Sequence, residues 1–266
     1  MPFVTSIFNL EDCILNTDII FATMSDKQVV LEKKNVSVFN KDVAENKGYR
    51  YTNNAPFSSQ VANLRQTQET LKLIGTNTKT VVDIGCGDGT YTIELAEARP
   101  DLKFAGFDPA SVAVDLAKEK RPDIDFQVAN LLDAASLPNK KYDVGIIRGV
   151  LHHLTDPALA IENAAKIADK IIIIEPNGNN PILKWIEKNS QYHIEHEERS
   201  FSQKLLTQWC NEKGLKVESL TVIGFVPFFF PTFPAKVIYF FQPFLELILP
   251  LKKFFGAQIV IVASKQ

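Results

Sequence analysis

The sequence predicts a doubly wound α/β fold, in which helices cover both faces of a mostly parallel sheet. Three observations predict it. Short β-branched runs alternate with stretches of helical periodicity from residue 80 to residue 223, as in parallel strands joined by crossover helices. A glycine-rich turn follows the first run, and an acidic residue ends the second. Both features stand where such a sheet binds a nucleotide-like ligand.

Length and composition bound the class of protein. The chain of 266 residues suffices for one domain, or for one domain with an appended cap. With 45% apolar and 23% charged residues, it has the composition of a globular protein. A formal net charge of −2 and the lack of a basic stripe disfavour nucleic acid as a partner. Three cysteines without paired spacing and an N-terminus without a signal-peptide pattern lead us to expect a cytoplasmic protein.

Residues 1–56 predict an N-terminal extension to a domain that covers 57–266. The β-branched runs 19–23 and 29–32 are separated by a Ser-Asp break and predict a small β-hairpin. A polar stretch then ends in the turn-forming Asn53-Asn54-Ala55-Pro56. From residue 57 to 74 the apolar residues recur at three- and four-residue steps, which predicts a helix. This helix would either cover the ligand site as a lid or serve only for packing.

The remaining elements follow from the alternation of patterns. We expect strands at 80–84, 103–107, 125–129, 142–147, 170–175, 215–223 and 258–263. We expect helices at 90–98, 110–120, 156–169 and 200–212, the last ended by Gly214. Ligands bind beyond the carboxyl ends of strands in open α/β sheets. The insertion 176–199 and the chain after the fourth strand begin at that edge and should shape the pocket, and a second insertion covers 224–256.

The spacing of the glycine turn selects the class of ligand. Gly85, Gly87 and Gly89 stand at alternate positions, whereas the dinucleotide fingerprint has its third glycine three places after the second. No P-loop pattern occurs, and a carboxylate at Asp88 would repel a pyrophosphate. S-adenosylmethionine fits better, because it has no phosphate and Asp83 and Asp88 would attract its sulfonium and ammonium groups. The alternative is an ordinary strand-to-helix turn.

Asp108 ends the second expected strand, near the roughly 20-residue separation from the turn that is typical of a ribose-binding acid. An acid there accepts hydrogen bonds from both ribose hydroxyls. The alternative role is that of a helix cap, since Asp108-Pro109 precedes a helical stretch. The two oxygens of the carboxylate allow both roles.

Four segments together resemble the class I S-adenosylmethionine-dependent methyltransferases of the small-molecule branch, over roughly residues 57–264. They are D-I-G-C-G-D-G-T from Asp83, G-F-D-P from Gly106, V-A-N-L-L-D from Val128, and Y-D-V-G-I-I-R-G-V-L-H-H-L from Tyr142. The resemblance implies a Rossmann-like methyltransferase fold of seven strands. The seventh strand would lie antiparallel between the fifth and the sixth.

The resemblance also implies a cofactor site for S-adenosylmethionine. The glycine turn would line the methionine portion, the Asp108-Pro109 corner would bind ribose, and residues 130–131 would flank adenine. Residues 148–153 would face the methyl group. The implied cofactor-binding residues are Asp83, Gly85, Cys86, Gly87, Asp88, Gly89, Asp108, Pro109, Asn130, Leu131, Arg148 and Gly149. Cys86 fits a position that needs a small residue, and a catalytic thiol is the weaker interpretation.

All four histidines fall on the expected pocket side and are the candidate general bases. His152 and His153 follow the fourth strand, and His193 and His196 lie in the first insertion. With an unperturbed pKa near 6.5, imidazole accepts a proton at neutral pH, and we favour His153 or His196. The alternatives are a packed structural histidine and a solvated polar face. The spacing of the second pair matches no strong metal-binding pattern, so we expect no metal.

Residues 225–255 hold 10 of the 19 phenylalanines. Pro243, Glu246 and Pro250 interrupt the apolar run, which disfavours a membrane-spanning helix of about 20 residues. Three interpretations remain: core packing, the wall of a pocket for an apolar acceptor, and a patch on a membrane surface with Lys252 and Lys253 near the headgroups. Core packing is the default.

These observations lead us to expect an enzyme that methylates a small-molecule acceptor at oxygen, in a saccharide, a phenol or a related metabolite. Transfer from a sulfonium needs mainly alignment and dehydration, and a hydroxyl acceptor also needs a base. One alternative is carbon methylation of a quinone- or lipid-like acceptor. Another is a non-catalytic cofactor-binding domain that regulates a partner. The sequence does not determine the oligomeric state.

Overall fold

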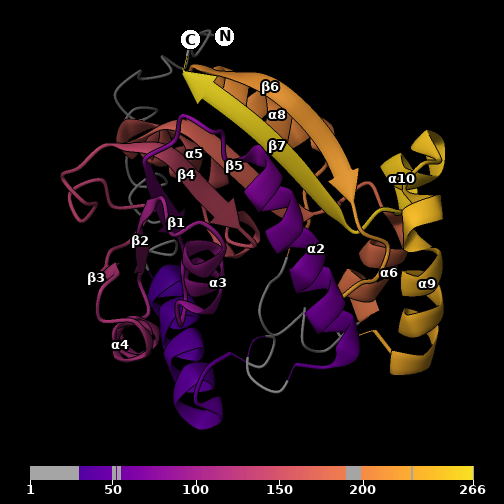
Figure 1. Cartoon of the computed structure of the whole chain (residues 1–266), viewed down its shortest axis with the longest axis horizontal. Coiled ribbons are helices and arrows are strands. Elements are labelled where there is room, and N and C mark those ends of the chain that lie inside the picture. The colour runs from indigo at the N-terminus through magenta and orange to yellow at the C-terminus, as the bar shows by residue number, and fades with distance from the viewer. Residues whose placement is uncertain (1–29, 50–51, 53–54, 190–198, 229, 266) are drawn as a thin grey trace, which may run out of the picture.

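A seven-stranded sheet forms the centre of the molecule, with the strand order β3-β2-β1-β4-β5-β7-β6 (Figure 1). The computed structural model describes residues 30–49, 52, 55–189, 199–228 and 230–265. The strands are β1 (Thr80–Ile84), β2 (Lys103–Asp108), β3 (Asp125–Val128), β4 (Tyr142–Arg148), β5 (Ala168–Pro176), β6 (Leu215–Ile223) and β7 (Gln258–Lys265). Strands β1 to β5 pair in parallel, and β7 is antiparallel to both β5 and β6. The predicted fold class and the position of the seventh strand are confirmed.

Helices cover both faces of this sheet because successive strand residues face opposite sides. Ile171 and Ile173 of β5 pack with α5 (Pro157–Ile167) and α8 (Gln203–Glu212). On the other side, Ile172 and Ile174 belong to the cluster that includes residues of α3 (Thr90–Ala98) and α4 (Ser111–Lys120), and Leu71 and Leu73 of α2 (Phe57–Leu73) pack against it. A strand buried on both faces is continuously apolar. Each element predicted between residues 57 and 223 is present, with ends shifted by at most a few residues.

The N-terminal extension differs from the prediction. Residues 30–46 form a helix, so the expected strand 29–32 is wrong over 30–32, and the expected strand 19–23 lies outside the described residues. Phe39 and Val43 pack with Ala113 of α4. Their helical spacing and this contact decide the structure, whereas the β-branched residues that suggested a strand carry only a weak preference.

Both insertions begin at the carboxyl edge of the parallel strands. The first contains α6 (Pro181–Asn189) and the second contains α9 (Thr232–Leu245) and α10 (Leu249–Phe255). Strand β6 runs parallel to β5, because both are antiparallel to β7. The second insertion therefore also starts beside the expected pocket. The side-chain amides of Asn177 and Asn180 donate to the carbonyl oxygen of Gly256 and join the two insertions.

Core packing, the default interpretation of residues 225–255, is wrong for the outer side of this segment. Phe233, Phe240 and Leu247 are 79%, 77% and 77% exposed. Among the described helices, none combines the length and the apolarity that crossing a membrane requires.

The helix over 30–46 predicts a distinct response to proline. Ser37 is exposed in its middle, so Ser37→Pro should remove a hydrogen bond of the helix and lower the free energy of unfolding by up to ~3 kcal/mol. Ser37→Ala is the matched control and should leave the stability unchanged or slightly higher. Urea unfolding measures both. Equal stability of the two variants would contradict a helix that packs on the domain.

Candidate active site

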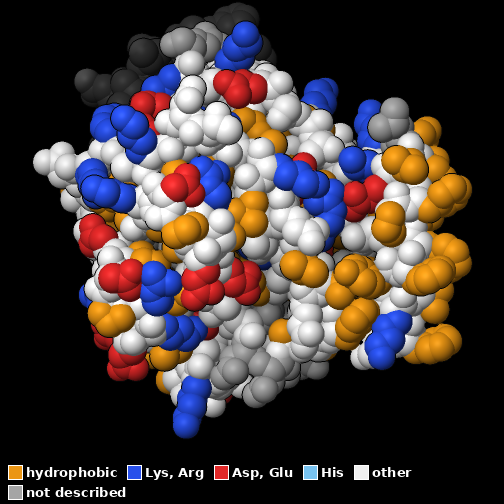
Figure 2. Space-filling view, in the orientation of Figure 1, with side chains coloured by type: hydrophobic (Ala, Val, Ile, Leu, Met, Phe, Trp, Pro, Cys, Tyr) orange, Lys and Arg blue, Asp and Glu red, His pale blue; other side chains and the backbone are white. Residues whose placement is uncertain are grey.

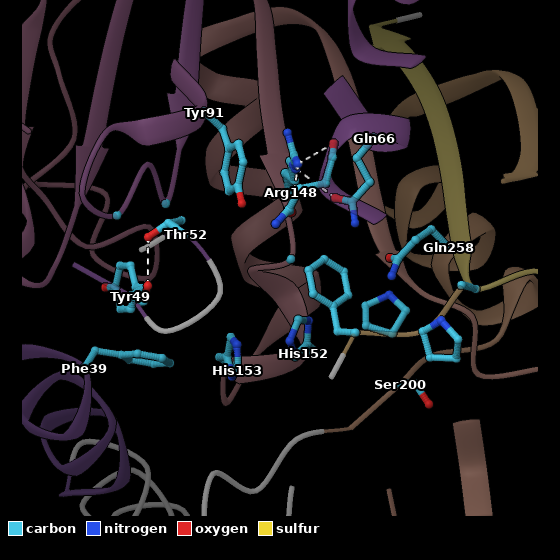
Figure 3. A pocket seen from close by; sticks show the side chains of 18 of the residues that line it. Phe39, Tyr49, Thr52, Gln66, Tyr91, Arg148, His152, His153, Ser200 and Gln258 are labelled. Carbon is cyan, nitrogen blue, oxygen red and sulfur yellow. Dashed lines mark hydrogen bonds between the residues drawn. The ribbon is translucent and has the colours of Figure 1, made fainter. Parts of the chain in front are cut away.

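A cavity of about 190 Å³ lies at the carboxyl ends of β1, β4 and β5 (Figure 3). The glycine turn and the chain after β4 form part of its wall. Residues from both insertions line it, including Ile186 and Phe228. Phe39, Tyr49 and Thr52 come from the N-terminal extension. The cavity is therefore built from segments that are far apart in the sequence.

Many of the predicted site residues meet in this cavity. Those that line it are Asp83, Gly85, Cys86, Gly87, Asp88, Arg148, Gly149, His152 and His153. The residues outside its lining are Gly89, Asp108, Pro109, Asn130 and Leu131. His193 and His196 lie outside the described residues. The cavity thus unites the predicted methionine and methyl-transfer portions, whereas the predicted ribose and adenine residues lie apart from it.

The glycine turn brings bare backbone to the cavity wall. Gly85 and Gly87 have backbone φ values of 79° and 55°. Residues other than glycine rarely adopt this region. A Cβ at Gly85 would lie 2.5 Å from Cγ2 of Val150, and one at Gly87 would lie 2.6 Å from Cε2 of Tyr49. Only glycine fits at both places. Such a turn leaves room for a ligand to approach the backbone closely, as S-adenosylmethionine requires.

The two acids of the turn differ in their electrostatic surroundings. Asp83 is buried and accepts a hydrogen bond of 2.5 Å from the hydroxyl of Thr92, and burial raises the pKa of its carboxyl. Asp88 forms an ion pair with Lys120 at 3.1 Å and accepts a hydrogen bond from Thr52. Lys120 therefore compensates the charge at Asp88 that the sequence analysis assigned to a cationic ligand. Asp83 also has a cation nearby, because the charge of Arg148 acts to lower its pKa against the larger effect of burial.

The side chain of Asp108 binds the backbone of the glycine turn. Its carboxylate accepts hydrogen bonds from the backbone N–H of Gly87 at 3.0 Å and of Ala110 at 2.8 Å. Burial raises the pKa of Asp108 to about 6. Burial and the charges of Asp108 and Asp88 raise the pKa of the neighbouring Tyr49. Tyr49 thus lies beside Asp108, and its ring belongs to the cavity wall. A carboxylate has lone pairs for further donors beyond these two.

Arg148 joins α2 to the end of β4. Its guanidinium donates hydrogen bonds to Asn63, Gln66 and Thr67 of α2 at 2.8–3.0 Å. It also lies over the ring of Tyr91, 4.0 Å from the centroid. The sequence analysis assigned Arg148 to the cofactor, and the structure shows it fixing the helix that was expected to be a lid or a packing element.

A buried carboxylate holds His152 at the cavity. Nδ1 of His152 lies 2.7 Å from Oε2 of Glu175, the fully buried last acidic residue of β5. The other oxygen of Glu175 accepts the backbone N–H of Val150 and of Leu151. The sequence analysis missed Glu175. The signal that could have identified it was an acid directly after four isoleucines at the carboxyl edge of the sheet.

His153 has different neighbours. Its ring packs edge to face against Phe39, with 5.0 Å between centroids, and lies beside the His152 ring at 3.9 Å. The side-chain amide of Asn35 donates to its backbone oxygen. These contacts match the alternative in which His153 is a packed structural residue. Within the described part of the chain, no group of three or more metal-ligating side chains occurs.

Comparison with known proteins agrees with this geometry. Residues 76–214, more than half of the chain, match the family model described as a methyltransferase domain. A putative methyltransferase of Invertebrate iridescent virus 6 is 31% identical over 99 residues, which are 36% of this chain and 37% of that protein. A ubiquinone biosynthesis O-methyltransferase of Hydrogenovibrio crunogenus is 29% identical over 92 residues, 33% of this chain and 37% of that protein. The chain thus spans well under half the length of these curated relatives.

Solved structures share the fold at low sequence identity. A SAM-dependent methyltransferase of Thermotoga maritima is 19% identical, with a TM-score of 0.61 over 87% of this chain and 100% of that chain. A geranyl diphosphate methyltransferase in complex with SAM is 15% identical, with a TM-score of 0.57 over 76% of this chain and 84% of that chain. Because the family match spans the glycine turn and the strands β1 to β5, the chain belongs to the methyltransferase domain family, among the class I S-adenosylmethionine-dependent methyltransferases.

Proposed function

We propose that the protein methylates the hydroxyl oxygen of a small phenolic acceptor, with His152 as the general base. The observation that carries this proposal is the contact of 2.7 Å between His152 and the buried Glu175 at the cavity wall. S-adenosylmethionine supplies a methyl group on a sulfonium, which is already activated for transfer. The remaining task of the chain is to align the acceptor, exclude water and remove the hydroxyl proton.

Backbone and acidic groups of the turn are the proposed holders of S-adenosylmethionine. Gly85, Gly87 and Gly149 have positive φ values and line the cavity, so no side chain obstructs the methionine portion. Asp83 is the proposed partner of the ammonium group. The ribose and adenine contacts of Asp108, Pro109, Asn130 and Leu131, with Gly89 and Cys86 shaping the turn, stay predictions.

Glu175 determines which nitrogen of His152 is basic. A carboxylate can only accept a hydrogen bond, so Nδ1 of His152 carries the hydrogen and Nε2 carries the lone pair. When Nε2 takes the phenolic proton, the negative charge of Glu175 stabilises the imidazolium that forms. The N–H groups of Val150 and Leu151 hold Glu175 in place. We therefore assign the base to His152 in preference to His153 and His196.

The lining of the cavity favours an aromatic acceptor over a saccharide. Phe39, Leu183, Ile186 and Phe228 contribute apolar surface. A phenol combines a flat ring, which these apolar side chains can contact, with one hydroxyl for the polar groups of the lining. The name of the ubiquinone biosynthesis O-methyltransferase relative also supports methylation at oxygen.

Carbon methylation of a quinone- or lipid-like acceptor is the second candidate. The same apolar walls favour it, and the geranyl diphosphate methyltransferase with a similar fold carries the name of an apolar substrate. In that reaction His152 would remove a proton from carbon. A non-catalytic regulatory domain is the remaining alternative. The pairing of His152 with Glu175 at the cavity weighs against it.

The proposed domain division gives the extension a part in the site. We retain 57–266 as the proposed methyltransferase domain and 1–56 as its extension. Because Phe39, Tyr49 and Thr52 line the cavity, the extension is proposed to complete the acceptor and cofactor walls. A cytoplasmic location stays a proposal based on cysteine usage.

The acceptor class is tested with methyl-labelled S-adenosylmethionine and a panel of simple phenols, prenylated quinones and sugars. We expect label in the phenols, with the methyl resonance of an aryl ether in the NMR spectrum of the product. A carbon-bound methyl resonance would replace the proposal by its second candidate. Cofactor binding without any transfer, to the panel or to cell extracts, would favour the regulatory alternative.

Substitutions of His152 and His153 should distinguish the roles of these two neighbouring histidines. His152→Ala should lower kcat by roughly 10²–10⁴-fold, because general-base catalysis is lost. His153→Ala is the matched control and should stay within about tenfold of the wild type, allowing for lost packing against Phe39. Steady-state kinetics on the phenol that is methylated best measures both. Full turnover by His152→Ala would refute the assignment.

Glu175 is a positioning residue, and its substitution should change the pH profile. Glu175→Gln keeps an acceptor oxygen but removes the charge that stabilises the imidazolium. The acidic limb of kcat/KM should therefore move to lower pH, with a lower plateau. A fall in rate at all pH values without a shift of the limb would indicate a structural role only.

Cofactor affinity should depend on the protonation of Asp108. Burial raises the pKa of Asp108 to about 6, and the ionised form is the better acceptor for ribose hydroxyls. Affinity for S-adenosylmethionine should therefore fall as the pH decreases through about 6. Asp108→Asn should bind more weakly at pH 7.5 and lack this dependence. Calorimetric titration between pH 5 and 8 checks both, and an unchanged affinity in the variant would remove Asp108 from the site.

A further inference from the structure

Helices α9 and α10 present an apolar outer surface beside α6 (Figures 1 and 2). We call it the aromatic face and define it by exposed side chains of these three helices and of the turn between α9 and α10. Its members are Phe233, Val237, Tyr239, Phe240, Phe241, Phe244, Leu247, Ile248, Phe254 and Phe255, with Ile182 and Trp185 of α6. Figure 2 shows these hydrophobic side chains gathered along one side of the molecule. So many large exposed apolar side chains on adjacent helices exceed the scattered pattern of ordinary surfaces.

Helix α9 exposes large aromatic side chains, while the smaller Ala235 is buried on its inward side and Ile238 packs there. Phe233, Phe240 and Phe244 recur at helical spacing on its solvent side. Its inward side carries Gln242, which accepts the backbone N–H of Phe225. Glu246, which caps the carboxyl end of the helix, also points inward, where it bonds to Arg65 and to the backbone N–H of Gly224. Polar contacts and the packing of Ala235 and Ile238 together attach the helix to the domain, and the large aromatic groups face outward. A further apolar phase on the outer side would remove these side chains from water.

The charged side chains of residues 225–255 are also divided between the inward and the outward side. Residues 225–255 contain four charged side chains, namely Lys236, Glu246, Lys252 and Lys253. Although burial opposes it, hydrogen bonds from Arg65 and the backbone N–H of Gly224 lower the pKa of Glu246. The single acid is therefore neutralised on the inward side. Lys236 and Lys253 are exposed, so the outward charge of the segment is positive.

We propose that the aromatic face docks the protein onto the surface of an anionic lipid bilayer. Aromatic and aliphatic side chains would enter the boundary between headgroups and acyl chains, and the lysines would contact acidic headgroups. The short helices α9 and α10 suit a position in the plane of the interface. The outward side of residues 225–255 carries lysines and no acidic side chain. A protein partner of ordinary composition would not require this combination of an aromatic surface with positive charge.

Docking would bring the cavity close to the bilayer. Helix α6 exposes Trp185 on one side, while Leu183 and Ile186 on its other side line the cavity. An apolar acceptor dissolved in the membrane would then reach the cavity without crossing water. This step rests on the proposed methyl transfer, whereas docking itself is measured without any reaction.

The two tryptophans allow docking to be tested without changing the aromatic face. Trp185 is exposed, and Trp209 packs against Phe201 beside the core. In a Trp209→Phe variant of the full chain, vesicles of phosphatidylcholine and phosphatidylglycerol should shift the Trp185 emission to shorter wavelength. Lipids brominated near the headgroup end of the acyl chain should quench it. An unchanged spectrum would overturn the proposal.

Vesicle flotation tests which residues are responsible. The triple substitution Phe233→Ser, Phe240→Ser and Phe244→Ser should weaken binding by at least roughly tenfold. The control is Val112→Ser with Leu220→Ser, which alters exposed apolar residues on α4 and β6 and should bind like the wild type. Lys236→Glu with Lys253→Glu should reduce binding to anionic vesicles more than to pure phosphatidylcholine. Circular dichroism melting verifies that each variant is folded.

Other occupants of the aromatic face predict different outcomes. If a second copy of the chain covered it, light scattering would show a dimer that the triple substitution dissociates, and vesicles would not bind. If a protein partner covered it, the chain would be monomeric and would again fail to float with vesicles. Either result overturns the proposal. Binding that ignores lipid charge and both sets of substitutions would overturn it as well.

Discussion

The buried carboxylate of Glu175 is the interaction on which the site depends. It stands at the carboxyl end of β5 and accepts two backbone N–H groups from the chain after β4, together with Nδ1 of His152. A buried charge is stable only when donors surround it. The three donors therefore fix the path of the chain after β4, and with it the place of both histidines. Loss of any one donor would leave part of the charge unsatisfied.

Arg148 positions helix α2, which covers the site, as Glu175 positions the chain after β4. It leaves the end of β4 and binds three polar side chains within about one turn of α2, Asn63, Gln66 and Thr67, and its guanidinium lies over the ring of Tyr91. Several geometrically fixed donors of one arginine hold α2 against the sheet edge more firmly than apolar packing alone. The extension adds Phe39 and Tyr49 on the neighbouring side. His152 and α2 are thus both positioned from the carboxyl end of β4.

Polar contacts add to a small apolar cluster, in which Val226 and Ala235 pack with Val61 of α2, in attaching the second insertion. Glu246 bonds to Arg65 and to the backbone of Gly224, and Gln242 bonds to the backbone of Phe225. The contacts that hold α9 therefore leave most of its aromatic side chains outside. This orientation of α9 explains how a segment so rich in phenylalanine remains at the surface and adjoins the cavity.

The sequence alone determined the sheet, the glycine turn and the family, because strand periodicity, glycine spacing and helix caps are local properties. It failed at 30–46, where packing against α4 decides between helix and strand, and at 225–255, where the orientation of α9 decides between core and surface. It also could not pair His152 with Glu175 or Asp88 with Lys120. Those contacts join residues from different strands and helices, and only the tertiary structure brings them within hydrogen-bond distance.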